Sequence, residues 1–332
     1  MMDKFAKKTL LEREEYKFIK DIPDIILLSF GGSIAYGTDL PGSDIDLRGI
    51  MMNPQEELLG MEADFGQKVF SETDTVIYSF KKMLGLLMAC NPNTVEILGA
   101  DPEDVLIATE AGKMLLDNKD IFLSKRAYKT FGGYALSQLN RLENRSGRAL
   151  DAIAENEKRS FIKAFSSFSA RHRGYVDESA AVVEKDGQLF VSMEFKDMPV
   201  TQASAILNEI NDIDKNYRKS ARNDKAVSHG KIAKHMMHLI RLFLMGRDIL
   251  AGDGIVTKRT KEHDLLMSIR RGDYLEADGV TPTKAFNELR EVLAEGMRIA
   301  YEHSPLPEEP DRDRINRLAV EVNRMYLEGR GL

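Results

Sequence analysis

Hydrophobic positions in the first third of the chain fall into short runs that are typical of a small sheet. Ile25 to Phe30 is apolar at every position except Ser29, which is the pattern of a buried strand. Residues 45–51 form a second candidate strand, and residues 74–80, rich in β-branched and aromatic side chains, form a third. Helical spacing is found around these strands at residues 4–20, 81–88 and 94–98.

Beyond residue 112 the apolar positions recur at helical spacing over much longer stretches. The long helices are predicted at residues 124–142, 147–170, 201–220, 228–250, 283–303 and 311–328. Residues 181–193 are the exception, because apolar residues there flank an Asp-Gly pair in the manner of a β-hairpin. We therefore expect an α+β fold, with a small mixed-sheet domain over residues 1–112 and a mostly helical domain over residues 113–332.

Composition restricts the kind of protein further. The 332 residues are 43% hydrophobic and 30% charged, as in an ordinary globular protein. The single cysteine, Cys90, excludes an internal disulfide and any zinc site made of several cysteines. No apolar run approaches the roughly 18 residues that a membrane span requires, and residues 1–20 lack the apolar core of a signal peptide. We therefore expect a cytoplasmic protein with no membrane partner.

The distribution of charge bears on the partners of the chain. A net charge of −6 argues against general coating of nucleic acid, which needs a strongly basic surface. The charge is uneven, however, since residues 113–173 contain 13 Lys and Arg against 6 Asp and Glu. This basic segment is either a solvated helical surface or a contact for an anionic partner.

Two aspartates, Asp44 and Asp46, carry the first chemical signal. If both lie on the second predicted strand, they project from one face while Ile45 points into the core. Two close carboxylates repel each other unless a cation lies between them. Mg²⁺ or Mn²⁺ is therefore the expected cofactor, because these ions prefer oxygen ligands. Taken alone, an Asp-x-Asp pair also occurs on ordinary surface strands.

The glycine-rich segment upstream carries the second signal. Gly31 and Gly32 follow the buried strand directly, so the backbone there can approach a phosphate without a Cβ in the way. Ser33 adds a hydroxyl donor, and a helix beginning here would favour an anion further. The alternative is a tight turn that only joins a strand to a helix.

Together, these signals form the segment GGSIAYGTDLPGSDIDLRGI, residues 31–50. It resembles the nucleotidyltransferase superfamily that includes DNA polymerase beta. Its amino-acid sequence is also similar to that of the RNA-repair-associated, RlaP-type predicted nucleotidyltransferases. The resemblance extends from Leu27 to Leu98, with a looser likeness in the helical half. It implies that the nucleotide is contacted by Gly31, Gly32, Ser33, Tyr36 and Ser43.

Members of this superfamily use three carboxylates, so the resemblance implies a third residue beside Asp44 and Asp46 that binds metal and takes part in catalysis. Asp74 fits the pattern of the group better than Glu72 does. Both would lie on one face of the third predicted strand, so the sequence leaves this choice open. Residues 89–90, Ala-Cys, depart from the Lys-Gly expected at that position.

A cationic stripe is predicted in the helical half. Lys231, Lys234, His238 and Arg241 recur at helical spacing, and the last three are expected to bind the triphosphate. The alternative is the solvated face of an amphipathic helix. Glu96 also has two interpretations: it orients a site residue, or it is a carboxylate favoured near the start of a helix.

The sequence therefore predicts transfer of a nucleoside monophosphate from an NTP to an acceptor hydroxyl, with release of pyrophosphate. Asp44, Asp46 and Asp74 are the expected catalytic and metal-binding residues. The acceptor is open, with an RNA end mildly favoured by the basic segment and a protein hydroxyl or small molecule as alternatives. The alternative function is a nucleotide-binding regulatory, toxin–antitoxin or defence module of the same fold.

Overall fold

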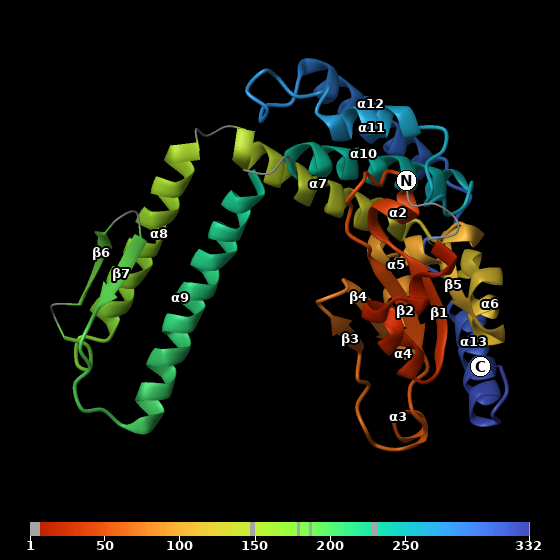
Figure 1. Ribbon diagram of the computed structural model, residues 1–332, viewed down its shortest axis with the longest axis horizontal. Helices are drawn as coiled ribbons and strands as arrows, with labels where there is room; N and C mark the ends of the chain where they lie inside the picture. The colour runs from red at the N-terminus through yellow and green to blue at the C-terminus, as the bar shows by residue number, and fades with distance from the viewer. Residues whose placement is uncertain (1–6, 147–149, 178–179, 186–187, 228–230, 332) are drawn as a thin grey trace. The chain divides into compact units, whose positions relative to one another are not determined.

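The computed structural model describes residues 7–146, 150–177, 180–185, 188–227 and 231–331 (Figure 1). The chain forms two compact units. Unit 1 contains residues 1–139, 236–274 and 283–332, and unit 2 contains residues 140–235 and 275–282. The predicted boundary at residue 112 separates a mixed-sheet domain from a helical domain. It divides the chain differently from these two compact units, and it stays a prediction.

Unit 1 is built on a mixed sheet with the order β3-β4-β2-β1-β5 among the described residues (Figure 1). β2 and β4 run parallel, whereas the other neighbouring strands are antiparallel. This sheet and the many helices confirm the predicted α+β class. The strands are β1 (Ile25–Phe30), β2 (Leu47–Met51), β3 (Gln67–Phe70), β4 (Thr75–Ser79) and β5 (Val105–Ala108).

The helices of unit 1 confirm most of the predicted helical segments. Short ones are η1 (Leu10–Glu12), η2 (Glu14–Asp21), α2 (Gly32–Tyr36), α3 (Gln55–Leu59), α4 (Phe80–Met88), α5 (Pro92–Leu98), η3 (Pro102–Asp104), α6 (Glu110–Asp117) and η4 (Lys119–Phe122). Longer ones are α7 (Arg126–Ser146, which enters unit 2), α10 (Lys231–Ala251, which begins in unit 2), α11 (His263–Arg271), α12 (Lys284–Glu302) and α13 (Arg312–Leu327). None of the helices in the described part of the chain is long and apolar enough to cross a membrane.

The segment before β1 differs from its prediction as a single helix over residues 4–20, the first of which lie outside the described residues. The chain instead forms the 3₁₀ helices η1 and η2. Their buried side chains, Leu10, Tyr16 and Ile19, are spaced by multiples of three. Because a 3₁₀ helix has three residues per turn, Tyr16 and Ile19 lie on one side of η2, and they join Leu10 of η1 in the core that includes residues of the sheet.

The acidic segments lie just before their strands rather than on them. β2 begins one residue after Asp46, so Asp44 and Asp46 belong to the preceding loop. The Gly31 amide still donates to the Asp46 carbonyl at 2.8 Å, which continues the β1–β2 pairing. β4 begins one residue after Asp74, which has a left-handed φ of 45° in the turn that also contains Glu72. The predicted placement of these carboxylates on strand faces is therefore wrong, and turn geometry sets their directions.

The core of unit 1 fixes the position of these loops. All six residues of β1 are buried. Gly49 of β2 lies against it so closely that a Cβ there would come 3.0 Å from Cδ1 of Leu28. The buried residues of this core are Leu10, Tyr16, Ile19, Ile25, Leu28, Phe30, Ile34, Leu47, Met51 and Ile77.

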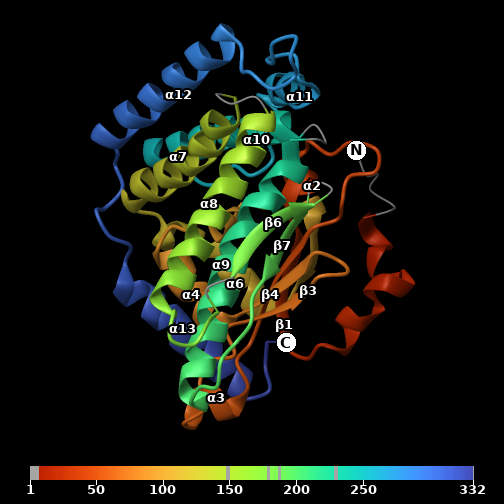
Figure 2. The ribbon, with the colours of Figure 1, turned by 90° about the vertical axis from the view of Figure 1, so that its left-hand side faces the viewer.

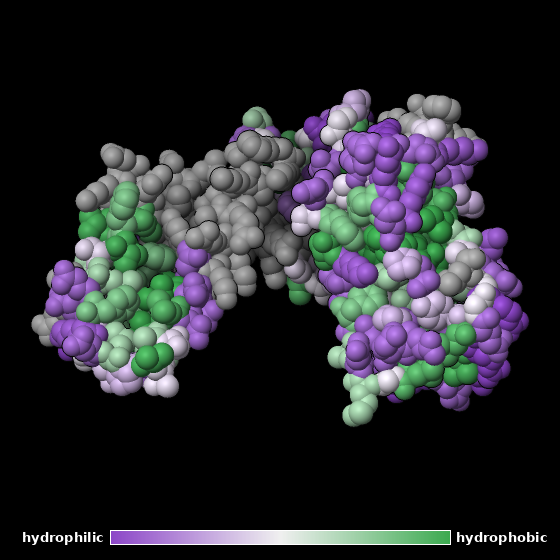
Figure 3. All heavy atoms as spheres, turned by 60° about the horizontal axis from the view of Figure 1, so that its bottom comes forward, coloured by the Kyte–Doolittle hydropathy of each residue, from purple (hydrophilic) through white to green (hydrophobic). Residues whose placement is uncertain are grey.

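Unit 2 pairs two long helices with a hairpin (Figure 2). The helices α8 (Leu150–Arg171) and α9 (Val200–Val227) confirm their predictions, as do the strands β6 (Ala181–Lys185) and β7 (Gln188–Ser192). The predicted Asp-Gly turn lies outside the described residues. Phe165, Phe168, Val176 and Ile206 form the core of the unit. Hydrophobic side chains also reach its surface (Figure 3), and Val183 and Phe190 of the hairpin are among the exposed ones.

Candidate functional site

The candidate site is centred on the loop between β1 and α2. Gly32 has a left-handed φ of 56°, a conformation that favours glycine. A Cβ at Gly32 would lie 2.0 Å from Oδ2 of Asp46. Glycine is therefore required here by the backbone conformation and by the close approach of a carboxylate. The bare backbone that the sequence suggests for a phosphate also admits the Asp46 side chain.

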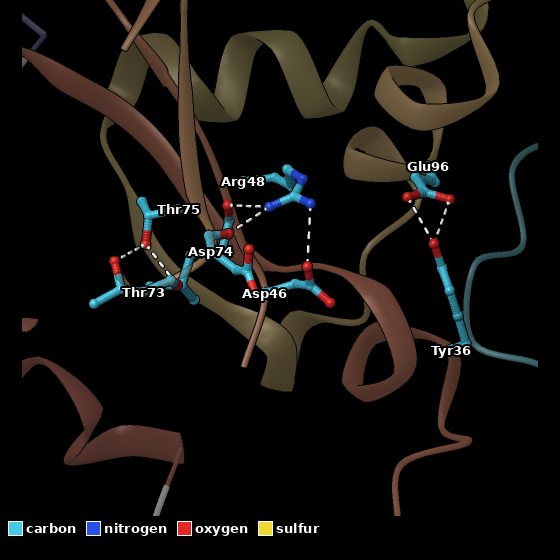
Figure 4. Close-up of polar contacts among 8 residues, drawn as sticks. Tyr36, Asp46, Arg48, Thr73, Asp74, Thr75 and Glu96 are labelled. Carbon is cyan, nitrogen blue, oxygen red and sulfur yellow. Dashed lines mark hydrogen bonds and ion pairs between the residues drawn. The ribbon is translucent and has the colours of Figure 1, made fainter. Parts of the chain in front are cut away.

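Arg48 connects Asp46 to the start of β4 (Figure 4). Its Nη2 donates to Oδ1 of Asp46 at 3.1 Å, and its Nη1 donates to the carbonyl oxygens of Leu47 at 2.8 Å and Asp74 at 2.7 Å. β2 and β4 are parallel neighbours in which Leu47 lies opposite Thr75. Asp46 and Asp74, each one residue earlier, are thus adjacent at the same edge of the sheet.

The candidate carboxylates differ in their exposure. The Asp46 side chain is 25% exposed, whereas Asp44 and Asp74 are exposed. Glu72, the alternative to Asp74, is exposed as well. Arg48 binds the side chain of Asp46 but only the backbone carbonyl of Asp74, so the Asp74 carboxylate takes no part in this connection.

The chemistry of these residues fits a hard divalent cation. Asp44, Asp46 and Asp74 offer carboxylate oxygens, which Mg²⁺ and Mn²⁺ prefer, and the space left by the missing Cβ of Gly32 holds one of these carboxylates. Among the described residues, however, no three His, Cys, Asp or Glu side chains are grouped so that they could hold a metal ion. A metal at Asp46 would therefore need further ligands, and substrate phosphates are the usual ones for Mg²⁺.

The two candidate serines have different surroundings. Ser33 is only 5% exposed. The Ser43 hydroxyl accepts hydrogen bonds from the Leu40 amide at 2.9 Å and from Nη2 of Arg270 at 3.3 Å. Ser43 also borders a pocket of about 290 Å³. The other residues that line this pocket are Arg13, Ile34, Asp39, Leu40, Pro41, Gly42 and Ile45.

Tyr36 and Arg241 meet in the interior, around the carboxylate of Glu96. The Tyr36 hydroxyl donates to Glu96 Oε1 at 2.9 Å (Figure 4), and Nη1 of Arg241 donates to Oε2 at 3.0 Å. The Arg241 guanidinium also lies 3.6 Å from the centroid of the Tyr36 ring. All three side chains are buried, so they support α2 from within. This arrangement matches the interpretation of Glu96 as a residue that orients others.

Burial shifts the pKa values in this cluster. It raises the pKa of Glu96 above its ordinary value, although Arg241 and Tyr36 act in the opposite direction. It also raises the pKa of Tyr36 well above the usual range of a phenol. For Arg241, burial lowers the pKa, but Tyr36 and Glu96 outweigh burial and the net pKa is raised. Tyr36 and Arg241 are therefore a neutral hydrogen-bond donor and a cation at ordinary pH.

The remaining members of the predicted cationic stripe lie one or two turns away on α10. Lys234 is exposed. His238 is half-buried, and its ring meets the Tyr36 ring edge-on with centroids 5.8 Å apart. The Lys231 side chain lies outside the described residues. The predicted stripe thus divides into an exposed cation and a buried part that contacts α2.

Two arginines were missing from the predicted site. Arg48 had a signal in the sequence, because it follows Asp46 by two residues and a strand places such residues on one side. Arg270 had none, since it is 227 residues from Ser43 and no local spacing connects them.

Comparison with known proteins identifies a family. The model of the family described as "RlaP: RNA repair pathway DNA polymerase beta family" matches residues 2–167. The match spans half of the chain and contains the glycine loop, all the candidate carboxylates and Glu96. No curated protein and no solved structure matches the chain.

Proposed function

Since the chain belongs to the RlaP family, the RNA repair pathway DNA polymerase beta family, we propose that it is a metal-dependent nucleotidyltransferase. In this reaction an acceptor hydroxyl attacks the α-phosphorus of an NTP, a nucleoside monophosphate is transferred, and pyrophosphate leaves. The observation that carries the proposal is the close approach of the Asp46 carboxylate to Gly32. Arg48 binds this carboxylate and also donates to the backbone carbonyl of Asp74. These contacts support the proposal because they put one carboxylate against the glycine loop and connect it to the backbone of the turn that carries Asp74.

Asp44, Asp46 and Asp74 are the proposed ligands of Mg²⁺ or Mn²⁺. When bound, the metal would supply the charge neutralisation that nucleotidyl transfer needs at the attacking and leaving oxygens. Asp44 and Asp46 belong to one loop and would hold the nucleotide. Asp74 comes from the turn before the neighbouring strand β4 and would act toward the acceptor.

The glycine loop and the serines are the proposed contacts of the triphosphate. The backbone at Gly31 and Gly32 is bare enough for close approach, and Ser43 borders a pocket in the loop that leads to Asp44. Ser33 is nearly buried, so its contribution would come through the loop that it belongs to.

The residues of α10 and the end of α2 have a supporting role in this proposal. Lys234 is exposed and belongs to unit 2, so its expected contact with the triphosphate stays a prediction. Tyr36, His238 and Arg241 would act through α2, because their side chains pack against one another at its end. Positioning of this kind contributes to catalysis by holding reacting groups in a productive geometry.

The proposed acceptor is an RNA end. The printed description of the family names an RNA repair pathway, and residues 113–173 carry an excess of positive charge that would contact a phosphate backbone. A protein hydroxyl and a small molecule are the other acceptors to be distinguished.

The test is to incubate the protein and Mg²⁺ with cell extract and each of the four α-³²P-labelled NTPs. We expect the label in RNA, removable by ribonuclease, with wild-type protein and none with Asp46→Asn. Label in protein or in a small molecule would contradict the RNA proposal while preserving the transferase. No labelled acceptor from any of the four NTPs would contradict the function itself.

A further inference from the structure

Arg48 holds two groups of contacts at once. Nη1 is bonded to the backbone carbonyl oxygens of Leu47 and Asp74, whereas Nη2 is bonded to the Asp46 carboxylate. The Leu47 carbonyl belongs to the first residue of β2, and the Asp74 carbonyl, one residue before β4, also accepts from the Leu47 amide at 3.3 Å, so both are held by the β2–β4 pairing. The Asp46 side chain is the partner that a metal would engage. The two halves of the guanidinium therefore have a fixed and an exchangeable partner.

The position of Arg48 places it beside the glycine loop. A Cβ at Gly31 would lie 3.0 Å from Cγ of Arg48, so the aliphatic part of the side chain runs along the bare backbone of Gly31. The side chain is 25% exposed, so part of it faces solvent. A guanidinium carries five N–H donors, and this one makes three hydrogen bonds to the residues around it.

We propose that Arg48 is a triphosphate-binding residue that exchanges Asp46 for a phosphate oxygen when metal binds Asp46. The inference rests on the proposed function and adds a residue to its substrate site. A cation bound to Asp46 neutralises the carboxylate and weakens its attraction for Arg48. Phosphate then offers the stronger partner, since guanidinium groups bind phosphate oxygens through charged, directional hydrogen bonds. Nη1 stays anchored on the carbonyls, so the exchange needs no movement of the strand.

This exchange predicts that one variant, Arg48→Gln, changes the affinity for metal and the affinity for phosphate in opposite directions. Arg48→Gln removes the cation that competes with metal for Asp46, so affinity for Mn²⁺ alone should hold or rise, by up to about fivefold for a half-exposed ion pair. The same variant loses a charged hydrogen bond to phosphate. Its affinity for magnesium tripolyphosphate, a probe that has no base or sugar, should fall by roughly tenfold or more.

Isothermal calorimetry of the full chain measures both affinities, with thermal melting as the check on folding. Arg48→Lys keeps the charge but has one nitrogen instead of a fork, so it cannot stay on the carbonyls with one nitrogen while another contacts phosphate; it should also bind tripolyphosphate more weakly while retaining Mn²⁺. Arg298→Gln is the matched control, because Arg298 pairs with Glu295 and Glu302 within α12. It should alter neither affinity.

The outcomes separate this proposal from the proposed function. If wild-type protein binds both probes and Arg48→Gln binds tripolyphosphate equally well, Arg48 does not bind phosphate and the nucleotidyltransferase proposal stands. If folded Arg48→Lys loses affinity for both probes together, Arg48 only shapes the metal site and the exchange is wrong. If the wild-type protein binds neither probe, both proposals fail.

Discussion

At the scale of single residues, Asp46 is the most constrained group of the site. Gly32 lies under one carboxylate oxygen and Arg48 binds the other. We predict that Asp46→Asn abolishes nucleotidyl transfer, because it removes charge from the proposed metal site. The lost ion pair with Arg48 is partly exposed and contributes about 0.2–1 kcal/mol, so thermal melting should change little. Near-native transfer by this variant would show that the metal-ligand assignment is wrong.

The contact between Gly32 and Asp46 can be tested with two glycines. Gly32→Ala combines a left-handed φ with a Cβ 2.0 Å from Asp46 Oδ2, so it should displace the carboxylate and weaken Mn²⁺ binding. Gly254→Ala is the control, since its φ of 83° is also left-handed but a Cβ meets nothing within 4 Å. It should lose about 1–2 kcal/mol of stability and keep its Mn²⁺ affinity. Equal Mn²⁺ affinities in the two variants would count against the role of this contact.

The assignment of the third carboxylate is tested by comparing variants of Asp74 and Glu72, which lie in the same turn before β4. We predict that Asp74→Ala loses turnover far more than NTP binding, because the proposed acceptor side of the site acts mainly in the transition state. Glu72→Ala should lose little of either. Steady-state kinetics with calorimetric NTP binding separates the two effects. The reverse ranking of the two variants would assign the role to Glu72.

At the scale of elements, α2 is held at both ends. Its first residue, Gly32, contacts Asp46, and its last, Tyr36, is bonded to Glu96 and stacked on Arg241. Glu96→Ala would leave the Arg241 guanidinium buried without its carboxylate, which costs about 3–5 kcal/mol. Glu96→Gln keeps an acceptor oxygen and should cost less, as measured by urea unfolding. Equal losses would mean that the acceptor oxygen kept by glutamine contributes nothing and that the missing charge accounts for the whole loss.

The raised pKa of Glu96 predicts a dependence of stability on pH. The folded protein takes up a proton at Glu96 more readily than the unfolded chain does. The stability contributed by this residue is therefore fully present below the pKa of 4.5 that an unperturbed glutamate has, and it is lost as pH rises through the raised pKa of the folded protein. Urea unfolding should show the stability of wild type relative to Glu96→Gln falling as pH rises through that window. A difference that is constant with pH would contradict the assignment.

The elements also show what the sequence could predict. The run from Ile25 to Phe30 and the glycine loop after it depend on local order, and both were found from local patterns. β3 and β5 were missed, because each is only four residues long: β3 is half polar and mostly exposed, and β5, although apolar, is too short to distinguish from a piece of helix or loop. The Glu96–Arg241 contact joins residues 145 positions apart, and only the packing of α5 on α10 could reveal it.

At the scale of the whole molecule, the basic segment belongs largely to α7 and α8, and part of it lies in unit 2. Arg159 and Lys163 are exposed on α8. If these residues contact an RNA acceptor, replacing both with Gln should weaken RNA binding and reduce the slope of log affinity against log salt by about 1.4. Lys284→Gln on α12, outside the segment, should leave that slope unchanged. Fluorescence anisotropy with single-stranded RNA over a salt series measures it, and an unchanged slope in the double variant would place the acceptor elsewhere.

The central claim, metal-dependent nucleotidyl transfer, is tested most directly by the position of the label in the nucleotide. The protein is incubated with extract and either α-³²P- or γ-³²P-labelled NTP, in Mg²⁺ or in EDTA. We predict that the α label enters the acceptor and the γ label is released in pyrophosphate, in Mg²⁺ only. Transfer of the γ label, or transfer of the α label that persists in EDTA, would contradict the claim.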